Sequence, residues 1–148
     1  MSGTITLRLA TIQDADLLLE WRNDPETRNA SHNAAEVQRD EHISWLLRTL
    51  DNRNRRLFVA EEEGVPVGSV RADFSEGVYE LSWTTAPSAR GRGVAKRMVA
   101  LLAQQISESI RAEVKTGNIA SSRIAEHAGM EFDREAEGVL HYRRSAFK

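Results

Sequence analysis

The pattern of apolar and polar positions predicts an alternating succession of strands and helices. Residues 5–9 alternate apolar and polar side chains, which is typical of a strand. Thr11, followed three positions later by Asp14, has the spacing of a capping box at the start of a helix. We expect this helix to end near residue 23, because Pro25 disfavours the helical conformation in the residue before it.

A second helix is predicted over residues 39–50. Apolar residues recur there at helical spacing and would form the stripe that faces the core: Ile43, Leu46, Leu47 and Leu50. At 100° per residue, Trp45 lies well away from the centre of this stripe, and His42 lies at its edge. The pattern therefore predicts a tryptophan and a histidine beside each other on an accessible face. A helix that packs on two sides, with Trp45 buried, is the alternative.

Three strands joined by tight turns are predicted in the middle of the chain. Residues 56–62 are rich in strand formers, and residues 63–64 form a turn into a strand over residues 65–74. The apolar phase of this second strand changes around Gly68, which predicts a β-bulge. A third strand is predicted over residues 78–84.

The second half of the chain alternates helices and strands. The sequence predicts a loop over residues 87–93, a helix over 94–109, a strand over 110–115, a helix over 120–128, and strands over 130–135 and 139–147. This order of elements predicts an α/β (α+β) fold with helices on both faces of a sheet. We expect residues 1–148 to form one domain.

Composition narrows the classes of function. The 148 residues, 41% hydrophobic and 28% charged, are enough for a globular core without cross-links. A net charge of −2 argues against a nucleic-acid partner, and no apolar run is long enough to span a membrane. The chain has no cysteine, so we expect neither a disulfide nor a metal site. Its first residues lack the pattern of a signal peptide, and we expect a cytoplasmic protein.

The loop before the long helix carries the clearest chemistry. Its sequence is Arg90-Gly91-Arg92-Gly93, and the helix starts directly afterwards. Glycines let the backbone approach an anion, a helix start offers N–H groups, and arginines supply positive charge. Together these features predict a pyrophosphate cradle. A plain glycine turn with solvated arginines is the alternative. A Walker loop and a dinucleotide fingerprint are excluded, because their further Lys or Gly residues are missing.

Two motifs resemble those of the GNAT superfamily of N-acetyltransferases. Arg90-x-x-Gly93-x-Ala95 resembles the family's Arg/Gln-x-x-Gly-x-Gly/Ala signature, and Asn118-x-x-Ser121 resembles its second motif. The order of elements is also the family's, so the resemblance covers nearly all of the chain. It implies a mixed, twisted sheet of six to seven strands, split into a V between the fourth and fifth strands, with acetyl-CoA in the V.

The resemblance also implies which residues hold acetyl-CoA. The end of the fourth strand would pair with the pantetheine arm, the loop would hold the pyrophosphate, and the second motif would lie near the thioester. The expected cofactor-binding residues are Thr84, Thr85, Ala86, Arg90, Gly91, Arg92, Gly93, Val94, Ala95, Asn118 and Ser121.

Acetyl transfer to an amine requires a base for the amine and a proton for the leaving thiolate. Glu80 is the first candidate base, because it lies on the polar face of a strand that we expect to be central. A purely structural Glu80 is an equal alternative. The tyrosine that many family members place seven residues after the motif asparagine is Ala125 here. Ser121 and Tyr142 are the remaining hydroxyl candidates for the acid.

The segments around the first two helices point to the acceptor. Trp-Arg-Asn and His-x-x-Trp resemble the UDP-amino-sugar N-acetyltransferases of nonulosonic-sugar pathways and, more loosely, the ribosomal-protein N-terminal acetyltransferases. Both groups place acceptor-binding residues in this region. The expected acceptor-binding residues are Arg22, Asn23, Arg28, His42 and Trp45.

The sequence therefore predicts an N-acetyltransferase that acts on the primary amine of a small molecule. A nucleotide-linked amino sugar leads the acceptor classes, followed by a protein N-terminus or another small amine. A non-catalytic acyl-CoA-binding domain is the alternative of another class, and Ala125 is its main support. A homodimer is left open.

Overall fold

The computed structural model describes residues 3–32 and 35–147. Its strands are β1 (Ile5–Leu9), β2 (Arg55–Glu62), β3 (Val65–Ser75), β4 (Val78–Thr85), β5 (Ser109–Lys115), β6 (Glu131–Ala136) and β7 (Val139–Arg144). Its helices are α1 (Ala15–Asn23), α2 (Pro25–Ala30), α3 (Arg39–Asp51), α4 (Val94–Gln105) and α5 (Ile119–His127). Short 3-10 turns, η1 (Ile12–Asp14) and η2 (Pro87–Ala89), precede α1 and the loop before α4.

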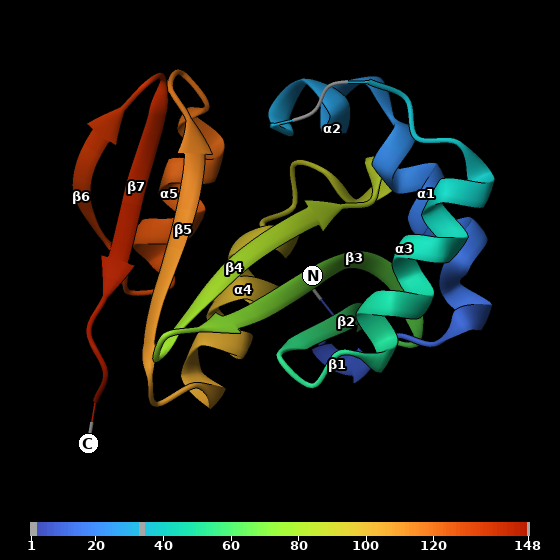
Figure 1. Ribbon diagram of the computed structural model, residues 1–148, viewed down its shortest axis with the longest axis horizontal. Coiled ribbons are helices and arrows are strands. Elements are labelled where there is room, and N and C mark those ends of the chain that lie inside the picture. The colour runs from blue at the N-terminus through green and yellow to red at the C-terminus, as the bar shows by residue number, and fades with distance from the viewer. Residues whose placement is uncertain (1–2, 33–34, 148) are drawn as a thin grey trace.

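The strands form one mixed sheet in the order β1-β2-β3-β4-β5-β7-β6. Helices α1 and α3 cover one face, and α4 and α5 cover the other (Figure 1). The core lies mainly between α4 and the sheet, where Met98, Val99 and Val94 are almost fully buried. This arrangement confirms the predicted α/β fold with helices on both faces.

The sheet opens between β4 and β5. These two strands are parallel and pair only at their first three residues, ending with Glu80 opposite Arg111. Beyond that pair they diverge, as Figure 1 shows. The predicted V-shaped split is confirmed, and Glu80 and Arg111 lie at its vertex.

Several predictions made from local signals are confirmed. Thr11 and Asp14 form the predicted capping box. Ala60 and Glu61 pair with Gly68 and Pro66, so Val67 is the extra residue of the predicted bulge. All three hairpins turn on a Glu-Gly pair with positive φ at both positions, the conformation of a tight two-residue turn.

Helix α2 was not predicted. Pro25 does end the first helix, but it also starts a second one, because proline fits the first helical position, where its missing N–H is not needed. Asp24 caps α2 by accepting a hydrogen bond from the N–H of Thr27 at 3.3 Å. The chain therefore turns sharply between α1 and α2 instead of continuing as a loop.

The predicted core stripe of α3 is only half right, since Ile43 and Leu46 pack in or against the core. Leu46 is fully buried as expected, but Leu47 and Leu50 are 51% and 38% exposed. The buried positions beside Leu46 are His42 and Thr49, which are 4% and 1% exposed. Apolar periodicity alone does not find this face, because two of its three residues are polar. The hydrogen bond from His42 Nε2 to Ala15 O, 3.0 Å, explains how a histidine can be buried there.

Trp45 consequently lies on the core side of α3 and not on an accessible face. Its ring is partly buried against the core and stacks on His42, with 5.7 Å between the ring centroids. The guanidinium of Arg71 on β3 lies over the same ring, 5.5 Å from its centroid. Trp45 thus connects α3 to the sheet. Its contact with an acceptor was predicted from a position away from the core, and the structure corrects that position.

Candidate active site

The backbone of the loop between β4 and α4 has the shape that an anion site requires. Gly91 and Gly93 have φ values of 80° and 73°, in the left-handed region that glycine adopts without strain. Gly93 is the N-cap of α4, and no side chain of the described residues caps this helix start. The first N–H groups of α4 are therefore directed at whatever occupies the open end of the split.

The three backbone positions expected to pair with the pantetheine arm do not all face the same edge of β4. Ala86 donates its N–H to Val67 O at 2.8 Å, so this group is committed to β3. Backbone groups of an antiparallel strand alternate between its two edges, so those of Thr85 are directed to the side of β5. Thr85 is thus the best placed of the three expected positions, and the pairing itself stays a prediction.

The side chains of the two loop arginines are engaged by the protein itself. Arg90 binds Asp24, Thr27 at 3.1 Å and Glu26 at 2.9 Å, all at the start of α2. Arg92 pairs with Glu62 on β2 at 2.7 Å. The Arg92 guanidinium, together with Arg97 and against the opposing effect of burial, holds the pKa of Glu62 below its usual value. The positive charges of both loop arginines are therefore already ion-paired within the protein.

Lys96 is a cation of this region that the sequence prediction missed. It lies in the first turn of α4, it is exposed, and no ion pair holds it within the described residues. A lysine three residues after Gly93 was a readable signal, because the first turn of a helix at an anion site faces the ligand.

Glu80 lies at the vertex of the split, on the face of the sheet that α1 and α3 cover. Its Oε1 is 3.0 Å from Arg111 Nη2, and its side chain is 34% exposed. Glu80 thus forms a half-buried ion pair between the two diverging strands. Arg111 was not predicted, because its position opposite Glu80 is set by the parallel pairing of β4 and β5.

Asn118 and Ser121 lie at the end of β5, on the other wall of the split. Asn118 Oδ1 accepts a hydrogen bond from the N–H of Ser121 at 3.2 Å and so caps α5. Ser121 is half-buried in the first turn of this helix. Ala125, at the family's usual tyrosine position, is fully buried, so α5 presents a methyl group to the core there.

Tyr142 does not lie with Glu80. It pairs with Ala112 on β5, which faces away from the neighbouring Arg111. Tyr142 therefore lies on the face that α5 covers, where it is 6% exposed and contacts Phe132 edge-on at 5.9 Å. The structure makes Tyr142 a core residue on the opposite side of the sheet from Glu80.

The predicted acceptor residues have structural partners as well. Asn23 binds the backbone of Val37 twice, at 2.9 and 2.7 Å, and so fastens the segment that follows α2. Arg28 lies 3.9 Å from Glu36. Burial first, and then the charge of Arg28, lowers the pKa of Arg22. Arg22 and Asn23 lie on α1 and Arg28 lies on α2, and their contact with an acceptor stays a prediction.

His42 differs from that group because it is buried. Burial lowers its pKa and outweighs the hydrogen bond to Ala15, which acts in the opposite direction. A buried imidazole that bonds to a helix backbone has a structural role, which weighs against His42 as a polar wall of the acceptor site; that role stays a prediction.

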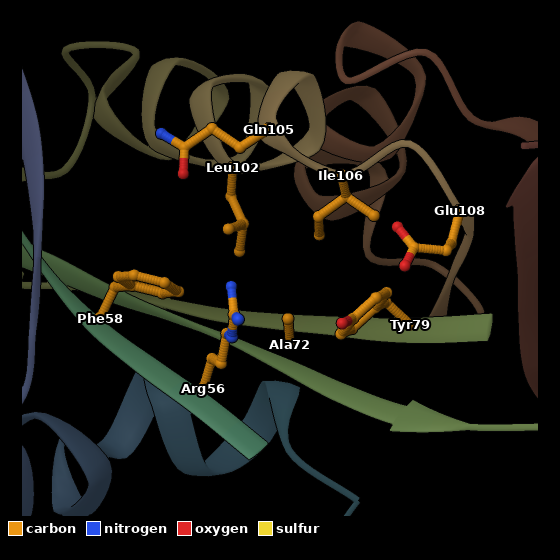
Figure 2. Close-up of a pocket in the computed structure, with 8 residues that line it drawn as sticks. All are labelled: Arg56, Phe58, Ala72, Tyr79, Leu102, Gln105, Ile106 and Glu108. Carbon is orange, nitrogen blue, oxygen red and sulfur yellow. The ribbon is translucent and has the colours of Figure 1, made fainter. Parts of the chain in front are cut away.

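A cleft of about 230 Å³ lies elsewhere, between the end of α4 and the sheet (Figure 2). Tyr79 at the start of β4 and Ile106 after α4 are among its lining residues. The 12 residues of α4 separate it from the glycine loop by about 18 Å. It is therefore distinct from the anion site at the other end of the helix.

Residues 3–32 and 35–147 contain neither a candidate metal site nor a membrane-spanning helix. No group of three or more His, Cys, Asp or Glu side chains is arranged to hold a metal ion. None of the described helices is long and apolar enough to cross a membrane.

Comparison with known proteins gives a family and a set of similar folds. Residues 4–131 match the family model described as "Acetyltransferase (GNAT) domain". No curated protein matches the sequence. A structure of aminoglycoside acetyltransferase AAC(6')-Ib with coenzyme A and kanamycin is similar, with a TM-score of 0.82, 19% identity, and coverage of 96% of this chain and 95% of that one.

Two further structures have the same fold. Spermidine N-acetyltransferase from Vibrio cholerae, with CoA and spermine, has a TM-score of 0.79 and 16% identity over 94% of this chain and 92% of that one. Ribosomal-protein-alanine N-acetyltransferase from Brucella melitensis has a TM-score of 0.78 and 24% identity over 95% of this chain and 99% of that one.

Proposed function

We propose that this chain, which belongs to the GNAT acetyltransferase family, transfers the acetyl group of acetyl-CoA to a primary amine. The observation that carries the proposal is the split between β4 and β5, with an uncapped helix start at its open end and a carboxylate at its vertex. Such a split offers one ligand an anion site, a backbone edge and a base along a single path.

The donor would be held chiefly by backbone groups. The N–H groups from Arg92 to Ala95 would bind the pyrophosphate, with Lys96 as the nearest cation without an ion pair in the described structure. The free backbone edge at Thr85 would pair with an amide of the pantetheine arm. This arrangement leaves the thioester in the split, between Glu80 and the start of α5.

The reaction then needs only proton transfers from this chain. The amine nitrogen attacks the thioester carbon, the C–S bond breaks, and an amide and coenzyme A are formed. Glu80 would accept the proton of the amine, through a water molecule, while Arg111 fixes the carboxylate. Ser121 is the side chain proposed to supply a proton to the thiolate, because Ala125 has none to give and Tyr142 lies on the other face of the sheet.

The acceptor would approach from the face that carries α1, α2 and α3. Polar side chains of both signs lie on that face of the sheet near the split, including Arg71, Asp73, Glu80, Arg111 and Glu113. A polar amine with several hydrogen-bonding groups fits this lining better than an apolar one does, so we keep an amino sugar linked to a nucleotide as the leading class. A protein N-terminus or a polyamine is the alternative, and the absence of cysteine fits work in the reducing cytoplasm.

The test is a release assay for coenzyme A thiol with a defined panel of amines. The panel would hold a UDP-linked amino sugar, kanamycin, spermidine and an alanyl peptide, each with saturating acetyl-CoA. Amine-dependent release supports the proposal and ranks the acceptor classes. Calorimetric binding of acetyl-CoA without release for any amine would favour the non-catalytic acyl-CoA-binding domain instead.

A further inference from the structure

The guanidinium of Arg90 makes its polar contacts with the start of α2. It donates to Asp24 and to Thr27 Oγ1, and its Nε pairs with Glu26. Asp24 is at the same time the N-cap of α2. One guanidinium from the cofactor loop therefore holds the residue that starts the helix, although 66 positions separate the two in sequence.

The far end of α2 is attached to the opposite wall of the split. Lys115, the last residue of β5, donates to Asn29 O at 3.0 Å. His32, just after α2, lies 3.6 Å from Glu113 on the same strand. Helix α2 thus reaches from the loop after β4 to the end of β5, at the open end of the split (Figure 1).

Helix α2 depends on these ties because it has little else to hold it. All six of its residues are at least partly exposed, so it contributes no buried anchor to the core. A helix of six residues is too short to be stable by itself. Charge-assisted hydrogen bonds from a planar guanidinium fork are the strongest polar contacts available to fasten it.

We propose that Arg90 is a positioning residue that fastens α2 as a strap across the acceptor side of the split, and is not itself a ligand of the pyrophosphate. The consequence of this inference for acceptor binding rests on the proposed function. When the loop backbone closes on the donor, Arg90 is held more firmly and α2 with it, so bound acetyl-CoA would further order the strap that the acceptor meets.

The two loop arginines provide a matched comparison. Arg92 is two residues from Arg90 but pairs with Glu62 on β2, away from α2. Arg90→Gln should therefore loosen α2, whereas Arg92→Gln should leave α2 as it is. Asp24→Asn should reproduce the effect of Arg90→Gln, because asparagine keeps the N-cap but loses the charge that Arg90 binds.

The experiment is hydrogen exchange of the amides of residues 25–30, with and without saturating acetyl-CoA, beside calorimetric titration with acetyl-CoA. In Arg90→Gln and in Asp24→Asn we expect exchange in α2 to become at least tenfold faster, and the Kd of acetyl-CoA to rise by the same factor in both variants, no larger than the protection that acetyl-CoA gives α2 in the wild-type protein. In the wild-type protein acetyl-CoA should slow exchange in α2, and this protection should be lost in both variants.

Two results would overturn the inference. The first is unchanged exchange in α2 of Arg90→Gln. The second is a Kd that rises tenfold in Arg90→Gln but not in Asp24→Asn, which would make Arg90 a phosphate ligand. Failure of the wild-type protein to bind acetyl-CoA would instead refute the proposed function, and exchange in the unliganded variants would still test the tie between Arg90 and α2.

Discussion

The proposed cofactor side and the proposed acceptor side of this protein are built in different ways. On the proposed cofactor side, two glycines with positive φ and a helix start form the candidate anion site within a few consecutive residues. On the proposed acceptor side, α1, α2 and α3 are positioned by side chains from distant parts of the chain, such as Arg90 and Lys115. A site made of local backbone can be read from a motif, whereas a site made of long-range side-chain contacts cannot.

The vertex of the split is where the two sides meet, and its disruption should have the largest effect. We predict that Glu80→Gln lowers kcat by about 10²- to 10⁴-fold, the usual contribution of a general base. The KM of acetyl-CoA should change little, because the donor is bound farther along β4. Steady-state kinetics of the variant with the best amine of the panel would check this.

Arg111→Gln is the matched control, because it removes the partner of Glu80 and keeps the carboxylate. Its loss of kcat should be smaller than that of Glu80→Gln. A variant Glu80→Gln with full activity would mean that Glu80 only joins β4 to β5, as the structural alternative holds.

The second prediction compares a buried and an exposed leucine of α3, a helix on the proposed acceptor side. Leu46→Ala should lower the free energy of unfolding by about 2–5 kcal/mol, because Leu46 is fully buried. Leu47→Ala, at a position 51% exposed on the same helix, should cost less than about 0.5 kcal/mol. Urea denaturation of both variants measures the difference, and equal losses would restore the leucine stripe predicted from the sequence.

The third prediction compares a glycine of the loop before α4 with a glycine of another turn. Gly93→Val should weaken acetyl-CoA binding tenfold or more, which corresponds to about 1.4 kcal/mol. The reason is the φ of 73°, since open space surrounds the position of the added Cβ. Gly77→Val is the control, because Gly77 has φ of 81°, equally open surroundings and a place just before β4, at the opposite end of that strand from the loop.

Both glycine variants should lose similar stability, because a branched side chain is strained wherever φ is positive. Calorimetry should find weakened acetyl-CoA binding only in Gly93→Val. Equal affinities in the two variants would show that the loop does not hold the donor.

The smallest effect is expected from acid. Asp14 is buried and bound by Arg8 at 2.8 and 2.9 Å, and this hydrogen bonding lowers its pKa in the folded protein. Stability from the pair is therefore fully present above the unfolded pKa of about 3.9. It is lost as the pH falls below that value and through the lower folded pKa.

Thermal unfolding from pH 6 to pH 2 would measure this loss, with Asp14→Asn as the comparison. The variant should be less stable at pH 6 and should approach the wild-type protein at low pH, where Asp14 is protonated in both folded and unfolded chains. Parallel curves at all pH values would show that Asp14 does not contribute to acid sensitivity.

The sequence by itself determined the order of strands and helices, the tight turns, the capping box of Thr11 and the glycine loop before α4. These features depend on residues a few positions apart, where the conformational preferences of glycine, proline and capping residues act directly. The family resemblance depended on the same local motifs. Residues 4–131 match the family model, which confirms the resemblance and with it the acetyltransferase class.

Only the tertiary structure decided which side of α3 is buried, that Pro25 starts a helix, that Tyr142 lies behind the sheet and that Arg90 is directed at Asp24. A buried histidine can replace a leucine when a carbonyl such as that of Ala15 is within hydrogen-bonding distance, and no periodicity records that carbonyl. The partner of an arginine is chosen by strand pairing and helix packing across dozens of residues. The acceptor side is therefore decided by contacts that exist only once the chain has folded.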